Sequence, residues 1–261
     1  MCGIVGVISK NPKNLHVIDV DIFKEMLICD SIRGWDSTGV FSINESGNSS
    51  YLRIATPPFN LLKSPEFKDW EKIGWGTGRA LIGHNRKATE GTITNENSHP
   101  FVHGNIILVH NGYINNYKSL LSAPLRTKYN VEVDSHAVCV LLAKQEPLKV
   151  LKELHGAFTF VWYDVLLRKL YFVRNEERTL AFANTEDKIY FASEHYLLVW
   201  LLSRRGIKTT ISYLEPNKLV TFTLEDPTFE WSSKTIALYE EPKLIQVEQP
   251  KPFSAKVIGL L

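Results

Sequence analysis

The sequence predicts an α+β fold built on antiparallel sheets. Many short runs are rich in β-branched and aromatic residues and are bounded by turn residues, which is typical of strands. These runs come in hairpin-like groups and do not alternate one to one with helical patterns, which argues against a doubly wound fold. The clearest hairpin joins Phe158–Asp164 to Lys169–Arg174 through a short polar link around Arg168.

Each expected element has a local signal. Apolar runs predict strands at Gly3–Ser9, Thr38–Asn44, Tyr51–Ala55, Ala80–His84, Ile106–His110, Phe158–Tyr163, Lys169–Arg174, Ile189–Ala192 and Leu219–Leu224. Apolar residues at steps of three and four predict helices at Val20–Ile32, Tyr113–Leu121, Asp134–Lys144, Leu148–Leu154 and Glu194–Ser203. Asp134 stands just before an apolar run, which is where a helix N-cap belongs.

The composition narrows the class of protein. The chain has 261 residues, of which 44% are hydrophobic and 22% charged, enough for a sizeable core. Thirty Lys and Arg against 28 Asp and Glu leave a net charge of +2, so we expect no nucleic-acid partner. The apolar stretches are too short to span a bilayer, and the N-terminus lacks the features of a signal peptide. With only three scattered cysteines, these features favour a cytoplasmic protein without a membrane partner.

We expect one domain over residues 2–239 and a separate C-terminal arm over residues 240–261. Three prolines among Lys and Glu residues predict an extended segment there. The arm ends in the apolar residues 257–261, which we expect to contact this domain or a partner.

Cys2 is the first candidate for chemistry. A small residue after the initiator usually allows the methionine to be removed, which would leave Cys2 with a free α-amine beside its thiol. Such an amine, with a pKa of about 8, can act as the general base for the thiol. The alternative is a buried structural cysteine at the start of a strand, and Cys2 taken alone favours that alternative.

Three further segments place polar side chains at the expected ends of elements. Arg86 follows a strand, and a guanidinium there can bind a carboxylate through two parallel hydrogen bonds. Asn111 and Gly112 offer two donors, the minimum for an oxyanion hole, although Asn-Gly is ordinarily a hairpin turn. A helical pattern follows this pair, which favours the first interpretation. Asp134 offers a carboxylate, which a plain N-cap would also explain.

Six motifs occur in one order along the chain. They are CGIVG at residues 2–6, RGWDSTG at 33–39, GHNRKATEG at 83–91, NSHPF at 97–101, HNGYINNY at 110–117 and VDSH at 133–136. Together they resemble class II, or N-terminal-nucleophile, glutamine amidotransferase domains, and the resemblance covers roughly residues 2–235. It implies a four-layer αββα sandwich of two antiparallel sheets.

The resemblance also implies a role for each matching residue. Cys2 would be the nucleophile with its own α-amine as base, and Arg33 would order the chain terminus beside it. The side chain of Asn111 and the backbone N–H of Gly112 would form the oxyanion hole. The implied substrate-binding set is Arg86 for the α-carboxylate of glutamine, Asp134 for its α-ammonium, and Thr89 and Lys87.

Three positions depart from the pattern that the family usually shows. Lys87 stands where many relatives carry an aromatic residue, Glu90 where some carry histidine, and His136 where a glutamate is frequent. These departures affect the expected affinity for glutamine and leave the nucleophile and the oxyanion pair intact. No cofactor is implied, and His99 and His103 lack the helix or nearby cysteines of a metal site, so we expect no metal.

The implied function is hydrolysis of L-glutamine to glutamate and ammonia through a thioester on Cys2. Members of the family are usually fused to a domain that consumes the ammonia, but the resemblance here covers roughly residues 2–235, and we expect the remaining arm to leave no room for such a domain. We therefore expect a separate ammonia-acceptor synthase or transferase subunit. Two alternatives stay open. One is a different N-terminal-cysteine amidohydrolase, which would have no obvious use for Arg86 and Asp134; the other is a non-catalytic glutamine-binding subunit, which would need no nucleophile.

Overall fold

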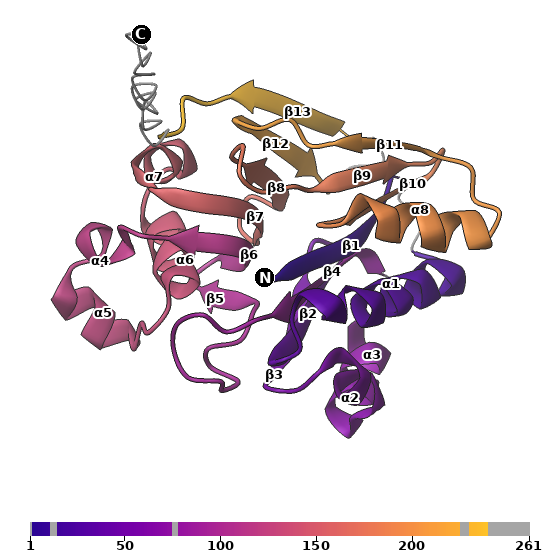
Figure 1. Ribbon diagram of the computed structural model, residues 1–261, viewed down its shortest axis with the longest axis horizontal. Helices are drawn as coiled ribbons and strands as arrows, with labels where there is room; N and C mark the ends of the chain where they lie inside the picture. The colour runs from indigo at the N-terminus through magenta and orange to yellow at the C-terminus, as the bar shows by residue number, and fades with distance from the viewer. Residues whose placement is uncertain (1, 11–14, 75–77, 225–229, 240–261) are drawn as a thin grey trace, which may run out of the picture.

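The computed structural model describes residues 2–10, 15–74, 78–224 and 230–239 (Figure 1). The predicted arm at 240–261 lies outside the described residues, so its contacts stay a prediction. Within the described ranges no helix is both long enough and apolar enough to cross a membrane.

The described strands form two sheets in which every strand pair is antiparallel. The first sheet has the order β11-β9-β10-β1-β4-β2-β3 and the second has the order β13-β12-β8-β7-β6-β5. The strands of the first sheet are β1 (Gly3–Ser9), β2 (Ser37–Asn44), β3 (Ser49–Ile54), β4 (Gly78–Arg86), β9 (Ala181–Asn184), β10 (Lys188–Ala192) and β11 (Thr210–Tyr213). The strands of the second sheet are β5 (Phe101–His103), β6 (Ile106–Ile114), β7 (Gly156–Asp164), β8 (Lys169–Arg174), β12 (Lys218–Thr223) and β13 (Glu230–Thr235).

Helices cover the outer face of each sheet, so the layers run helix, sheet, sheet, helix (Figure 1). The first sheet is covered by α1 (Val17–Cys29), α2 (Pro58–Lys63), α3 (Pro65–Gly74) and α8 (His195–Arg204), with the short 3-10 helix η1 (Asp30–Arg33) after α1. The second sheet is covered by α4 (Tyr117–Leu120), α5 (Ala123–Tyr129), α6 (Asp134–Lys144) and α7 (Pro147–Glu153). This arrangement confirms the predicted αββα sandwich.

The alternation of side chains along β1 shows how the layers are specified. Ile4 and Ile8 are buried between the two sheets, whereas Val5 and Val7 are buried against the helical layer. Successive side chains of a strand point to opposite faces, so Cys2, two residues before Ile4, belongs to the face between the sheets. The fold therefore directs the thiol inward at the end of β1.

The strands and helices that the sequence predicted are present, with one wrong assignment. A helix was predicted over Tyr113–Leu121, but β6 continues to Ile114 and the helix covers only Tyr117–Leu120. The β6 ladder pairs with β7 as far as Ile114 opposite Gly156. Non-local pairing thus overrides a local helical period.

The N-cap prediction for Asp134 was wrong by one residue. Asp134 is the first residue of α6, and Val133 stands at the cap position. The carboxylate instead accepts hydrogen bonds from the backbone N–H of Ile114 at 2.8 Å and of Ser135 at 2.6 Å. It therefore joins α6 to the end of β6. Several elements had no clear signal in the sequence: β5, β9, β11, β13, α2, α3 and α5.

A buried carboxyl lies beneath the start of β1. Asp30, at the beginning of η1, is fully buried, and its Oδ2 accepts a hydrogen bond from Asn85 Nδ2 at 3.1 Å. A Cβ on Gly3 would lie 1.9 Å from this oxygen, so only glycine allows the approach. Burial raises the pKa of Asp30 to about 7, while the charge of Arg33 acts in the opposite direction.

Asp30→Asn is expected to change how stability depends on pH. Between its ordinary pKa of 3.8 and about 7, Asp30 holds a proton in the folded state that it has lost in the unfolded state. The free energy of unfolding therefore falls as pH rises through this window. Asn cannot ionise, so the stability of the variant relative to wild type should increase across the window, by on the order of 4 kcal/mol. Urea denaturation of both proteins at several pH values measures this difference, and parallel curves would contradict it.

Candidate active site

The Cys2 thiol lies against the end of β4. β1 and β4 pair with Gly3 opposite Asn85, which sets Cys2 beside the residues that follow Arg86. The backbone N–H of Lys87 donates to Cys2 Sγ at 3.4 Å, and Sγ lies 3.6 Å from the carbonyl oxygen of Lys87. Burial raises the pKa of the thiol, and the Lys87 hydrogen bond lowers it by a smaller amount. A thiol in this place needs a base to become a thiolate at neutral pH.

Arg33 holds the backbone of Cys2. Its Nε donates to the Cys2 carbonyl oxygen at 2.8 Å, and its Nη1 contacts the carboxylate of Glu194. Asp36, in the same segment, accepts the N–H of Ala88 at 2.8 Å and donates its own N–H to the carbonyl of Arg86 at 3.0 Å. The segment 33–36 therefore fixes both the main chain of Cys2 and the end of β4.

Asn111 is tied to β1 through one serine. Its Nδ2 donates to Ser193 Oγ at 3.2 Å, and the same oxygen accepts the N–H of Ile4 at 2.9 Å. Asn111 is two residues after Val109 on β6, and Val109 is buried between the sheets. Side chains two residues apart point to the same face of a strand, so the Asn111 side chain belongs to the same inter-sheet face as Cys2. The second N–H of the amide is left for another acceptor.

Gly112 could not carry a side chain. Its φ is +146°, and a Cβ would lie 1.8 Å from the carbonyl oxygen of Ala157 on the neighbouring strand β7. Glycine alone allows the β6 backbone to follow this path beside the cavity.

The two remaining charged residues of the predicted site are a buried arginine, Arg86, and a half-buried aspartate, Asp134. Arg86 is 5% exposed, and its guanidinium donates to the carbonyls of Glu90 at 2.6 Å and Thr92 at 3.2 Å. Burial lowers the pKa of Arg86, but a guanidinium stays protonated in proteins. Asp134 accepts the backbone N–H groups of Ile114 and Ser135 and, at 3.1 Å, the hydroxyl of Ser135.

One cavity brings most of these residues together. It is lined by Cys2, Arg86, Lys87, Thr89, Glu90, His99, His110, Gly112, Val133, Asp134 and Ser135. Its free space is about 20 Å³, room for a water or two, but a hollow of about 210 Å³ shares Thr89, Glu90 and Asp134 with it. Of the predicted site residues, Asn111 and Arg33 are not among those that line it. Arg33 contacts the Cys2 carbonyl, and Asn111 is linked to Ile4 through Ser193.

Comparisons with known proteins identify the family of this chain. Residues 84–199 match a family model described as a glutamine amidotransferase domain. The chain is also 33% identical over 204 residues to a glutamine–fructose-6-phosphate aminotransferase (isomerizing) of Sulfurisphaera tokodaii, covering 76% of this chain and 31% of that protein. An enzyme of the same name from Aliivibrio fischeri is 30% identical over 238 residues, covering 85% of this chain and 35% of that protein. This is a class II glutamine amidotransferase domain.

Solved structures show the same fold. Glutamine phosphoribosylpyrophosphate amidotransferase from B. subtilis, complexed with ADP and GMP, superposes with a TM-score of 0.66 at 18% identity, over 91% of this chain and 50% of that one. A structure titled as the allosteric regulatory enzyme of purine biosynthesis gives a TM-score of 0.68 at 18% identity. The chain spans about a third of the length of the curated relatives it matches.

Several cavity residues of the amidotransferase domain were not predicted as site residues. His99, His110 and Glu90 line the cavity, and Ser193 and Glu194 hold Asn111 and Arg33 from the end of β10. Glu90, His99 and His110 belong to the motifs at residues 83–91, 97–101 and 110–117, so their position in those motifs was the available signal. The Lys87 ammonium lies 3.5 Å from Asp36, so its side chain is directed at segment 33–36 and only its backbone meets the thiol.

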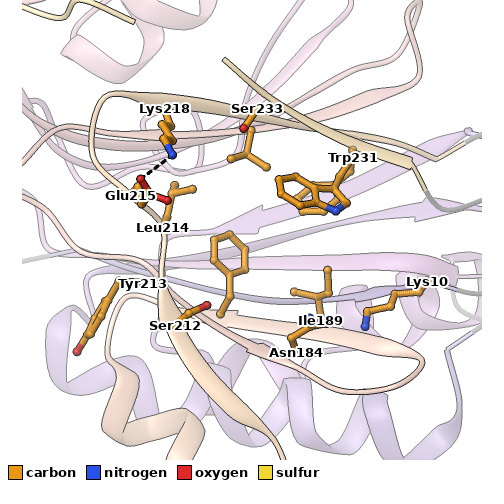
Figure 2. A pocket seen from close by; sticks show the side chains of 13 residues that line it. Lys10, Asn184, Ile189, Ser212, Tyr213, Leu214, Glu215, Lys218, Trp231 and Ser233 are labelled. Carbon is orange, nitrogen blue, oxygen red and sulfur yellow. Dashed lines mark ion pairs between the residues drawn. The ribbon is translucent and has the colours of Figure 1, made fainter. Parts of the chain in front are cut away.

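A larger cavity of the amidotransferase domain, of about 460 Å³, lies at the opposite end of β1 (Figure 2). Lys10 follows the C-terminal end of β1 and lines this cavity, whereas Cys2 precedes its start. Trp231 and an ion pair between Lys218 and Glu215 form part of its wall. None of the predicted site residues lines this larger cavity. The smaller cavity beside Cys2 is therefore the candidate active site.

Gly112→Ala is expected to destabilise the domain strongly. The new methyl group would collide with the Ala157 carbonyl and force a φ that side chains avoid, which together cost roughly 4 kcal/mol. Gly206→Ala is the matched control, because Gly206 has a φ of +66° but open space around it; it should cost only about 1 kcal/mol. Urea denaturation of both variants measures the difference, and equal losses would show that the close approach of β7 does not matter.

Proposed function

We propose that this domain hydrolyses L-glutamine to glutamate and ammonia through a γ-glutamyl thioester on Cys2. The observation that carries the proposal is the single cavity in which a thiol, a guanidinium and a carboxylate from three separate segments meet. A nucleophile between a cationic and an anionic group suits an amide that carries an amino-acid head. Neither charged group would be needed for a simple amide.

The proposed reaction begins with loss of Met1, which leaves the α-amine on Cys2 itself. This amine takes the thiol proton, and the thiolate attacks the side-chain carboxamide of glutamine. The free N–H of the Asn111 amide and the N–H of Gly112 stabilise the oxyanion, and one such donor is typically worth about 3–4 kcal/mol in the transition state. The C–N bond then breaks, and the amine returns the proton to the leaving nitrogen as ammonia.

Water completes the proposed cycle. It adds to the thioester carbonyl, and the same amine takes a proton from it. The C–S bond breaks, glutamate leaves, and the thiol is restored. During both steps Arg86 would hold the α-carboxylate and Asp134 the α-ammonium. Hydrogen bonds with the backbone fix the orientation of both side chains. Arg86 keeps further N–H donors for the substrate, and Asp134 keeps further lone pairs.

The ammonia is expected to pass to a separate acceptor synthase or transferase subunit. Two considerations support an acceptor. The curated relatives are named glutamine–fructose-6-phosphate aminotransferases. Ammonia released into water at neutral pH is mostly protonated and therefore a poor nucleophile. Purifying a complex of this chain with its partner tests whether the acceptor enzyme is a separate chain. The partner should aminate its substrate with glutamine only when this chain is present, and with ammonium salts when this chain is absent.

Cys2→Ala should abolish glutaminase activity, with a loss of at least about a thousandfold, because the covalent step disappears. Glutamate formation is followed for protein whose loss of Met1 is confirmed by intact mass. Cys29→Ala is the matched control, since Cys29 is a second half-buried free cysteine outside the cavity. A third protein with a fixed N-terminal extension keeps the thiol but blocks the amine, and it should be as inactive as Cys2→Ala. Full turnover by that protein would exclude the α-amine as base.

Arg33→Lys should lower kcat by about 10- to 100-fold with little change in KM. A lysine cannot donate to the Cys2 carbonyl and the Glu194 carboxylate in the same fork geometry, and hydrogen bonds to charged groups are worth about 1.5–3 kcal/mol. Arg205→Lys is the control, because Arg205 pairs with Glu25 in the helical layer at 2.8 Å. A rise in KM alone would place Arg33 in substrate binding.

A further inference from the structure

His110 occupies a place that the proposed chemistry does not use. It precedes Asn111 on β6, is 1% exposed, and packs on the ring of Phe160 with 4.5 Å between centroids. It also lines the cavity that holds Cys2 and Asp134. A buried imidazole beside a charged anchor can serve as core packing or can hold that anchor in place.

The hydrogen bonds around His110 fix the position of its proton. The hydroxyl of Ser135 donates its one hydrogen to Asp134 Oδ1 at 3.1 Å. His110 Nδ1 lies 2.9 Å from the same hydroxyl oxygen, so Nδ1 must carry the hydrogen and donate to it. The result is a relay from the imidazole N–H through the serine hydroxyl to the carboxylate. Burial lowers the pKa of His110 to about 4, so near pH 7 the ring is neutral and carries a single hydrogen, on Nδ1.

The other ring nitrogen does not compete with this relay. His110 Nε2 is buried and has no hydrogen-bond partner among the described residues. Among the described residues, the imidazole is therefore hydrogen-bonded through Nδ1 alone. Because Nδ1 donates, the Ser135 hydroxyl keeps its own hydrogen for Asp134. The opposite oxygen of Asp134 is held by the N–H of Ile114 at 2.8 Å. Both carboxylate oxygens are thus fixed, and the plane of the group beside the cavity is set.

We propose that His110 and Ser135 are positioning residues that orient the Asp134 carboxylate toward the α-ammonium of the substrate. The relay thereby sets the preference for glutamine over amides that lack the α-amine. This inference rests on the proposed function, because it assigns the group that Asp134 binds. If His110 served only as packing for Phe160, its loss would weaken every ligand of the cavity alike.

The test compares two ligands in a Cys2→Ala parent from which Met1 has been removed. Dissociation constants are measured by calorimetry for L-glutamine and for glutaramate, which is glutamine without its α-amine. Ser135→Ala should lower the preference for glutamine about tenfold or more, because a hydrogen bond to the charged anchor is lost, and glutaramate binding should not change. His110→Phe keeps a ring against Phe160 and should act in the same direction. Ser37→Ala is the control, because its buried hydroxyl has no partner among the described residues.

The outcomes separate this inference from the proposed function. A parent that binds no glutamine would overturn the proposed function and the relay with it. A parent that binds glutamine, with an unchanged preference in both relay variants, would overturn the relay alone. Equal weakening of both ligands would assign His110 and Ser135 to packing. Retention of the parent's thermal unfolding midpoint by both variants ensures that the comparison is made between folded proteins.

Discussion

The antiparallel pairing of β1 with β4 is the constraint on which the candidate site depends. Gly3 lies opposite Asn85 in this register, so the residue before β1 and the residues after β4 share one end of the sheet. A slip by one residue would turn Cys2 to the helical face, because side chains alternate along a strand. The Lys87 N–H on the thiol and the Arg33 guanidinium on the Cys2 carbonyl both require this register. The close approach of Asp30 to Gly3 fixes the same strand end from the other face.

Much of this arrangement could be predicted from the sequence because its signals are local. The strands at Gly3–Ser9 and Lys169–Arg174 were predicted with the bounds that they have, since continuous apolar runs with flanking turn residues leave little choice. The order of motifs placed Cys2, Arg86 and Asp134 in one site. What the sequence could not supply are contacts between distant segments. Asn111 binds Ser193, which is 82 residues further along the chain, and no local pattern marks that pair.

The wrong helix at Tyr113–Leu121 has the same cause. Ile114, Tyr117 and Leu121 are spaced as in a helix and all three are buried, so the period is real, but it spans a strand end and a helix start that share one core. Pairing of β6 with β7 decides the conformation as far as Ile114. The spacing of apolar residues within one short segment cannot reveal this pairing with a distant strand. That extension places Gly112 within a strand and brings the Ile114 N–H to Asp134.

The site consists of two parts, each held together by its own strand pairing or hydrogen bonds. The thiol, Arg33 and Arg86 are joined through β1 and β4, whereas Gly112, His110 and Asp134 are joined through β6 and the start of α6. Each part belongs to a different sheet, so the distance from the Cys2 thiol to the Gly112 N–H is set by how the two sheets pack. Figure 1 shows the start of β1 facing β6.

One direct polar link between these parts is the Asn111 amide on Ser193 Oγ, which also holds the N–H of Ile4. The apolar layer of Ile4, Ile8, Val109 and Val161 supports it along the same interface. Small changes in this inter-sheet core should therefore alter the geometry of the candidate site before they alter the fold, because close-packed interiors transmit displacement rather than absorb it.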